Sequence, residues 1–114
     1  LKVKTHVECE EIELNLDTSI PLGLIVNEIV TNAFKHAFVG RTEGNIWVVL
    51  KHSSSHKFEL RVKDDGVGFQ RESREGSIGL ELVKGLTQQI KGEFHYSSTQ
   101  DGTLSTVSFD GKID

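Results

Sequence analysis

The first residues in this sequence that could do chemistry lie in the stretch LIVNEIVTNAFKHAF, residues 24–38. Four polar side chains interrupt its apolar residues at intervals of three and four, which an α-helix would place on one face: Glu28, Asn32, Lys35 and His36. Carboxylate and amide oxygens suit Mg²⁺, which commonly shares its coordination shell with nucleotide phosphates, and a nearby lysine could meet those phosphates. A solvated helix face that carries these residues without a ligand is the alternative that the spacing leaves open.

A second candidate is an acidic residue at the end of a strand pattern, FELRVKDDGVGF, residues 58–69. Alternation by two places Asp64 on the same face as the apolar residues before it, so we expect its carboxylate to point inward. A buried carboxylate needs hydrogen-bond donors, and the exocyclic amino group of a nucleobase is a suitable one. Gly66 and Gly68 would let the backbone approach a flat ligand closely. An ordinary Asp-Gly turn between two strands is the alternative.

Two glycine-containing segments complete the candidate chemistry. Gly76, Ser77 and Gly79 stand where an amphipathic helix begins, and the free N–H groups of a helix N-terminus attract phosphate. Ser77 could instead be only an N-cap, and Gly79 a close-packing residue. The segment 101–103 precedes the last strand pattern, where a hairpin turn explains it equally well.

Two helices and several strands must position these residues. Capping side chains and a proline at 17–21 predict the start of the first helix, and Gly40 its end. Its apolar face consists of Leu22, Ile25, Val26, Ile29, Val30, Ala33, Phe34 and Ala37. The second helix is expected over 78–91 with Gly92 as its stop, and its apolar side consists of Ile78, Leu82, Val83, Leu86 and Ile90.

Alternating patterns predict six strands, at residues 1–7, 11–16, 46–52, 58–64, 93–97 and 103–109. The first two would form an opening hairpin or two edge strands, and the charged segment 70–75 a mobile loop. Together these elements predict a two-layer α/β sandwich, with the helices packed on one face of a mixed, mostly antiparallel sheet.

Composition limits the classes of protein. The 114 residues fit one domain, 1–114, and the net charge of -4 argues against a nucleic-acid surface. No run of eighteen apolar residues could cross a bilayer, so we expect no membrane contact by this chain. Cys9 is the single cysteine, which favours a reducing cytoplasmic location. The chain opens with Leu1, and we expect it to be a piece of a longer protein.

Four motifs follow one another across nearly the whole chain: NEIVTNAFKHAF, DDGVGF, SIGLELVKGL and Gly102-Thr103. In this order they resemble the N-box, the two glycine boxes and the final Gly-Thr element of the ATP-binding catalytic domain of sensor histidine kinases. That domain belongs to the superfamily of DNA gyrase, the Hsp90 chaperones and MutL. The resemblance implies the left-handed β-α-β sandwich of that superfamily, known as the Bergerat or GHKL fold.

The resemblance also implies a role for each matching residue. Catalytic roles fall to three residues of the first helix: Asn32 as a Mg²⁺ ligand, Glu28 as its helper and Lys35 as a phosphate contact. The base and its pocket would be contacted by His36, Asp64, Gly66, Gly68 and Thr103. The phosphates would be cradled by Gly76, Ser77, Gly79 and Leu80, beneath a lid formed by residues 70–75.

The implied reaction is phosphoryl transfer from ATP, with Mg²⁺, to a histidine on upstream dimerisation helices, followed by transfer to a response regulator. Three departures from the family pattern bear on this expectation. Glu75 and Ser77 stand where many relatives have glycines, and the lid is short. None of the histidines lies in a phosphoacceptor motif: His6, His36, His52, His56 and His95. The chain would therefore bind ATP without accepting its phosphoryl group.

Other functions stay open at this point. An anti-sigma-factor serine kinase shares the superfamily, and its phosphoacceptor is a serine on a partner protein instead of a histidine. A nucleotide-free interaction module with a decayed pocket is a second alternative, motivated by Glu75 and Ser77. Zinc binding by His52 and His56 is a third and weaker one, because only Cys9 could join them and a polar hairpin tip explains both histidines.

Overall fold

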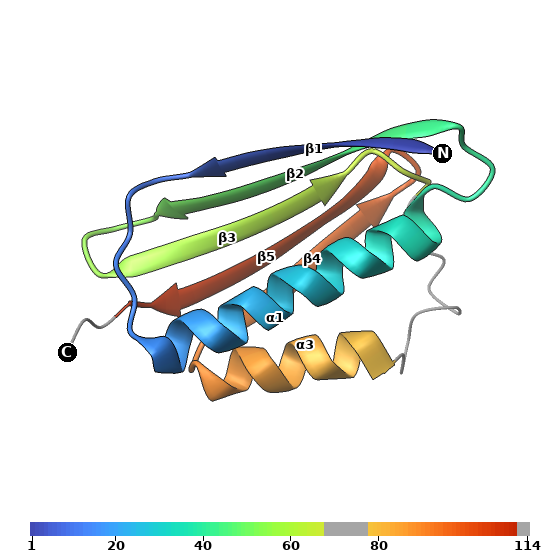
Figure 1. The fold of residues 1–114 in the computed structure, drawn as a ribbon. Helices are drawn as coiled ribbons and strands as arrows, with labels where there is room; N and C mark the ends of the chain where they lie inside the picture. Colours follow the sequence, from blue (N-terminus) through green and yellow to red (C-terminus); the bar gives the residue numbers. More distant parts are fainter. Residues whose placement is uncertain (68–77, 112–114) are drawn as a thin grey trace.

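The structure is a computed structural model that describes residues 1–67 and 78–111. It has two layers (Figure 1): a five-stranded sheet, and two helices packed against one of its faces. The strands lie in the order β1 (Lys2–Cys9), β2 (Glu43–His52), β3 (Lys57–Asp64), β5 (Gly102–Asp110) and β4 (Glu93–Thr99). β1 runs parallel to β2, and every other neighbouring pair is antiparallel. The predicted two-layer sandwich with a mixed sheet is confirmed.

The beginning of the chain differs from the prediction of two strands. β1 is a single strand in register with β2 from Lys2 opposite Glu43 to Cys9 opposite Leu50, and residues 11–15 form no strand. Parallel neighbours require a crossover connection, which the first helix supplies. Ile12 and Leu14 pack partly buried against the core on the way to that helix. The alternation of apolar and polar residues here belongs to the segment that connects β1 to α1. The predicted strand over 11–16 is therefore wrong.

The first helix, α1 (Leu16–Asn32), begins earlier than predicted because Asn15 caps it. The Asn15 side-chain oxygen accepts a hydrogen bond of 3.0 Å from the Thr18 N–H, so Pro21 lies inside the helix and not in its first turn. After Asn32 the chain continues as a π-helical turn, η1 (Ala33–Ala37). The expected stop at Gly40 is close, since that residue follows in a turn with φ of +77°.

The core lies between the sheet and the layer formed by α1 and α3 (Ile78–Gln89). Its largest fully buried side chains come from both layers: Ile25, Ile46, Leu60, Val83 and Val107. Phe34 and Leu82 were predicted to face this core, but each is 45% exposed. Consecutive residues of a helix point in different directions, and Ala33 and Val83 occupy the buried positions next to Phe34 and Leu82.

The chain leaves α3 through Lys91 and Gly92, whose roles differ from the predicted ones. The helix ends at Gln89, and Lys91 adopts the left-handed conformation, with φ of 57°, that was expected of the stop residue Gly92. Gly92 donates a backbone hydrogen bond of 2.9 Å to the Thr87 carbonyl. A Cβ atom at Gly92 would lie 2.6 Å from the Ser108 carbonyl oxygen, so close packing on β5 requires this glycine.

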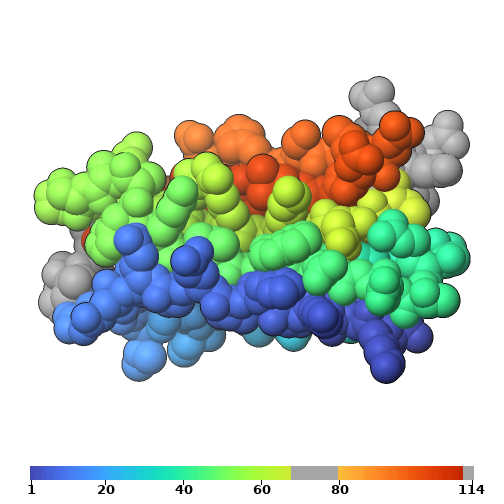
Figure 2. All heavy atoms as spheres, turned by 90° about the horizontal axis from the view of Figure 1, so that it is seen from above, coloured from blue at the N-terminus to red at the C-terminus, as the bar shows by residue number. Residues whose placement is uncertain are grey.

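In the described part of the chain no helix covers the other face of the sheet. Figure 2 shows this face from above, with β1, β2, β3, β5 and β4 following one another across the surface. Trp47 on this face stacks on His6 with ring centroids 5.4 Å apart, and the Lys63 ammonium lies 5.7 Å from the Trp47 ring centroid. Within residues 1–67 and 78–111, no helix combines the length and apolar character needed to cross a bilayer.

Candidate functional site

The candidate site is built at the end of the sheet where β3 stops and β5 starts. Asp64 is the last residue of β3 and lies opposite Thr103 of β5, on the helix-facing side of the sheet. Only 5% of Asp64 and 3% of Thr103 are exposed. The Asp64 carboxylate accepts a hydrogen bond of 3.0 Å from the Gly66 N–H, which provides one of the donors that a buried acid needs. The predicted inward direction of Asp64 is confirmed.

Two hydroxyl residues that the sequence reading did not select extend this polar end of the core. Ser105 is 5% exposed, and the Ser98 hydroxyl lies 2.9 Å from the Thr103 hydroxyl. Alternation by two from Thr103 along β5 would have found Ser105. Ser98 required the pairing of β4 with β5, in which it lies opposite Thr103. The apolar rows of the sheet thus give way to polar groups next to Asp64.

Two glycines allow the backbone to close around Asp64. A Cβ atom at Gly66 would lie 2.1 Å from the Ala37 carbonyl oxygen, and one at Gly102 would lie 2.0 Å from the Asp64 carbonyl oxygen. The Val67 N–H donates a hydrogen bond of 2.7 Å to Ala37, which fastens the turn after β3 to the end of η1. Gly66 was predicted to make room for a flat ligand, and the requirement visible here is packing against the helix end.

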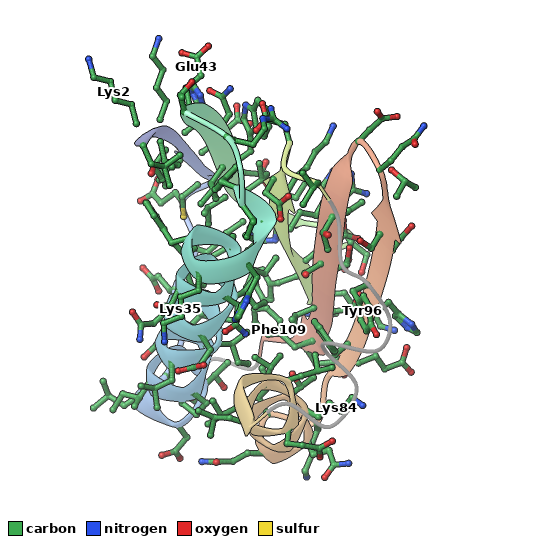
Figure 3. All side chains as sticks on the ribbon, turned by 90° about the vertical axis from the view of Figure 1, so that its right-hand side faces the viewer. Lys2, Lys35, Glu43, Lys84, Tyr96 and Phe109 are labelled. Carbon is green, nitrogen blue, oxygen red and sulfur yellow. The ribbon has the colours of Figure 1, made fainter. Side chains whose placement is uncertain are left out.

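The four polar residues of the helical stripe divide between two kinds of helix. Glu28 and Asn32 lie in α1, one turn apart and partly buried, whereas Lys35 and His36 lie in η1 and are exposed. Figure 3 shows Lys35 on α1's side of the domain, with Tyr96 of β4 on the opposite side of the view. The expectation of one regular helix is wrong beyond Asn32, because a π-turn holds more residues than an α-turn and changes which face each one occupies.

The donor set on α1 fits a magnesium ion. The Asn32 amide oxygen and the Glu28 carboxylate supply the hard oxygen ligands that Mg²⁺ prefers, and this ion usually takes the rest of its shell from phosphates and water. Among the residues that the structure describes, no group of three His, Cys, Asp or Glu side chains could hold a metal ion. A Mg²⁺ ion held by Asn32 and Glu28 would take its remaining ligands from phosphates and water.

Asn32 also borders a small cavity between the two helices and the sheet. Its volume is about 20 Å³, enough for one water molecule, and its lining residues are Ile29, Asn32, Leu80, Val83, Phe94, Tyr96 and Ser105. Asn32 of α1 and Leu80 of α3 thus line the same cavity. Gly79 is the second residue of α3. The remaining predicted residues lie outside the described part of the chain: Gly68, Gly76, Ser77 and the lid at 70–75.

A wider, open hollow of about 1090 Å³ lies at the other end of the sheet, beside the β2–β3 turn. His52 and His56 both line it, together with Phe58 and Asp110. No residue predicted for nucleotide binding takes part. We therefore place the candidate site at the Asp64 end, where the buried polar groups gather, and not at the larger hollow.

Asp65, the residue after Asp64, has a perturbed pKa. Burial by itself would raise the pKa of Asp65, but hydrogen bonds from the side chain and backbone of Asn45 and the charge of Arg41 lower it below the usual range. The sequence reading selected neither Asp65 nor Asn45. The second acidic residue of DDGVGF was the available signal for Asp65.

A family model decides the identity of the domain. The model described as histidine kinase-, DNA gyrase B-, and HSP90-like ATPase matches residues 17–113. The chain belongs to this ATPase family. The resemblance drawn from the four motifs is therefore confirmed, and the chain is an ATP-binding domain of the kind found in histidine kinases.

Relatives of this ATPase domain include kinases with two kinds of acceptor. Blue-light-activated histidine kinase 2 of Erythrobacter litoralis is 30% identical over 108 residues, which are 92% of this chain and 31% of the relative. The serine-protein kinase RsbW of Listeria innocua is 43% identical over 58 residues, which are 51% of this chain and 36% of the relative. The chain spans about a third of the length of each.

Solved structures agree with the fold. The histidine kinase domain of the Erythrobacter litoralis blue-light activated histidine kinase matches with a TM-score of 0.88 and 27% identity, covering 94% of this chain and 54% of that one. The mycobacterial sensor histidine kinase MprB matches with a TM-score of 0.78, 21% identity and coverage of 98% and 84%. The second likeness concerns the fold alone.

Proposed function

We propose that this ATPase domain is the catalytic part of a two-component sensor histidine kinase. It would transfer the γ-phosphoryl group of ATP to a histidine on dimerisation helices outside residues 1–114. The observation that carries ATP recognition is the buried carboxylate of Asp64, which lies beside Thr103 at the polar end of the core. The histidine acceptor is supported by the match to a histidine kinase over 92% of the chain, whereas the serine kinase RsbW matches 51%.

At the adenine end, Asp64 would accept a hydrogen bond from the exocyclic amino group. Its orientation is supported by the Gly66 N–H, which already occupies one lone pair of the carboxylate. Thr103, Gly66 and Gly68 would form the walls of the base pocket, and His36 would line its entrance. A hydrogen bond made to a buried acceptor discriminates strongly against a base that lacks the donor, because the acceptor would then be left unpaired.

At the phosphate end, Asn32 and Glu28 would hold Mg²⁺, whose charge would neutralise and orient the phosphates. Lys35, which lies in η1, would contact a phosphate oxygen. Gly76, Ser77, Gly79 and Leu80 would cradle the phosphates at the start of α3, beneath the short lid at 70–75. Phosphoryl transfer depends mainly on positioning and charge stabilisation, so these contacts would supply most of the catalysis that this domain contributes.

The whole protein would therefore contain more than this domain. Its partners would be the dimerisation and phosphoacceptor helices of the same protein and a response regulator, and the domain would work in the cytoplasm. The 31% share of the histidine kinase relative that the chain covers supports the presence of further domains.

Nucleotide binding to the 114-residue chain tests the first half of the proposal. Mg-ADP at a hundredfold excess over its dissociation constant should raise the free energy of unfolding by about 2.7 kcal/mol. Asp64→Asn should abolish the effect while the fold is kept, and Asn32→Ala should weaken binding in Mg²⁺ far more than binding in EDTA. A chain that gains no stability from millimolar Mg-ADP would be the nucleotide-free module considered above.

The acceptor is tested with the full-length protein and ATP labelled at the γ-phosphate. Phosphate on histidine is lost in acid because the P–N bond hydrolyses there, whereas a phosphate ester on serine survives. Acid-labile label supports the histidine kinase. Acid-stable label on a partner protein would favour the serine kinase, whose support here is the 43% identity to RsbW over 58 residues.

A further inference from the structure

Asp65 and Asn45 form a reciprocal pair directly beside the candidate adenine site. The Asn45 backbone N–H donates to one carboxylate oxygen of Asp65 at 2.7 Å, and the Asn45 side-chain amide donates to the other at 2.9 Å. In return, the Asp65 N–H donates to the Asn45 carbonyl at 3.2 Å. Three hydrogen bonds therefore join the first residue after β3 to the start of β2.

This pair lies at the point where the β2–β3 ladder would otherwise end. The last paired residues of the two strands are Ile46 and Asp64, so the bonds between Asn45 and Asp65 extend the pairing by one residue. Strand ends open easily because their backbone groups exchange with water. Fixing Asp65 from both its backbone and its side chain therefore also fixes the backbone from which the Asp64 side chain projects.

The surroundings keep the Asp65 side chain ionised and engaged. Arg41 donates a hydrogen bond of 3.3 Å to the Asp65 carbonyl, and its charge favours the carboxylate form. The Asn45 side-chain oxygen lies 3.0 Å from the His6 ring nitrogen, which orients the Asn45 amide so that its NH₂ group faces Asp65. Hydrogen bonds to a charged acceptor are stronger than neutral ones.

We propose that Asp65, acting with Asn45, is a positioning residue for base recognition, which holds the Asp64 carboxylate in the direction that selects a purine with an exocyclic amino group. This inference rests on the proposed ATP-binding function. Asp65 need not contact the nucleotide, because its carboxylate is already occupied by Asn45. Its effect would pass through Asp64 to the base.

The test compares ADP with purine riboside 5′-diphosphate, which lacks the amino group, by calorimetric titration of the wild type and its variants. The wild type should prefer ADP by about tenfold or more, as expected for one hydrogen bond to a charged group. Asp65→Asn should reduce this preference to about threefold or less, because the side-chain NH₂ group of Asn45 would lose the carboxylate oxygen that accepts its hydrogen bond. The double swap Asn45→Asp with Asp65→Asn re-creates an amide–carboxylate pair in the opposite direction, and it should restore the preference.

Two further variants separate positioning from folding. Asn45 and Asp65 line a surface hollow that Glu43 also lines. Glu43→Gln removes an acidic residue from this hollow and leaves both members of the pair in place, so it should leave the preference unchanged. Asn45→Ala removes the side-chain bond to Asp65 together with the contact to His6 and keeps the backbone bonds, and it should lower the preference even if Asp65→Asn fails to fold. Urea unfolding of each variant identifies those that bind weakly because they are unstable.

The outcomes distinguish this inference from the function on which it rests. If the wild type binds neither diphosphate, the proposed function fails and the positioning role falls with it. If the wild type prefers ADP and Asp65→Asn keeps that preference, the positioning role alone is overturned. If Asp65→Asn weakens the binding of both diphosphates equally, Asp65 only stabilises the fold, which also overturns the inference.

Discussion

Replacing Gly66 with alanine should destabilise the domain severely. The new Cβ atom would lie 2.1 Å from the Ala37 carbonyl oxygen and 2.6 Å from the Ala37 carbonyl carbon, so the contact is with backbone and no side chain can rotate away. Ordinary contact begins near 3.4 Å, which requires a displacement of about 1.3 Å between the turn after β3 and the end of η1. That displacement would also break the 2.7 Å hydrogen bond from Val67 to Ala37.

The expected cost is about 1–3 kcal/mol for the overpacking and about 1 kcal/mol for the hydrogen bond, or roughly 2–4 kcal/mol together. Urea unfolding followed by circular dichroism measures it. Gly23→Ala is the matched control, because a Cβ atom at Gly23 meets nothing within 4 Å and the residue lies in α1. This control should gain about 0.5–1 kcal/mol from helix propensity. A Gly66→Ala protein within 0.5 kcal/mol of the wild type would refute the packing argument.

Three other changes have defined outcomes. Ile25→Ala should lower the free energy of unfolding by about 2–4 kcal/mol, because Ile25 is fully buried, and chemical denaturation would test this against the exposed Ile20→Ala. Asn15→Ala should cost about 1 kcal/mol through loss of the α1 cap, whereas Asn15→Asp should keep most of the stability; thermal unfolding compares the two. Asp65 has a lowered pKa in the folded state, so its contribution to stability is complete above the unfolded value near 3.9 and is lost as the pH falls through about 4 and below. Urea unfolding between pH 6 and 3 should decline less steeply for Asp65→Asn than for the wild type, and parallel declines would contradict this.

Local patterns predicted the parts of the site that local rules determine. The inward direction of Asp64 followed from alternation along β3, which pairs on both sides and cannot shift by one residue without turning its apolar face outward. The turn at Asp101-Gly102 was predicted from the Asp-Gly dipeptide between two strand patterns, and Gly102 has a φ of +136°, which glycine accepts readily. The two helices followed from their apolar periodicity, including Ile25 and Val83 at the centre of the core.

Features that depend on contacts between distant segments could not be predicted from the sequence. Asn45 and Asp65 are twenty residues apart, and only the β2–β3 register brings them together. The first helix was predicted to start within Asp17, Thr18 and Ser19, which are all good capping residues. In the structure Asn15 is the cap, and the sequence offered no signal that favours Asn15 over them. The parallel pairing of β1 with β2 could not be predicted without the position of α1. A short alternating segment is equally consistent with a strand of a hairpin and with a segment of a crossover connection.

The π-helical turn at Ala33–Ala37 affects how this domain should be compared with its relatives. A π-turn accommodates about one residue more than an α-turn of the same length, so a relative whose helix is regular throughout falls out of step at this point. An alignment by sequence letters would then pair Lys35 or His36 with a neighbour of the true counterpart. Superposition of backbones, anchored at Asn32 before the turn and at β2 after it, gives the correspondence that the letters alone would misplace.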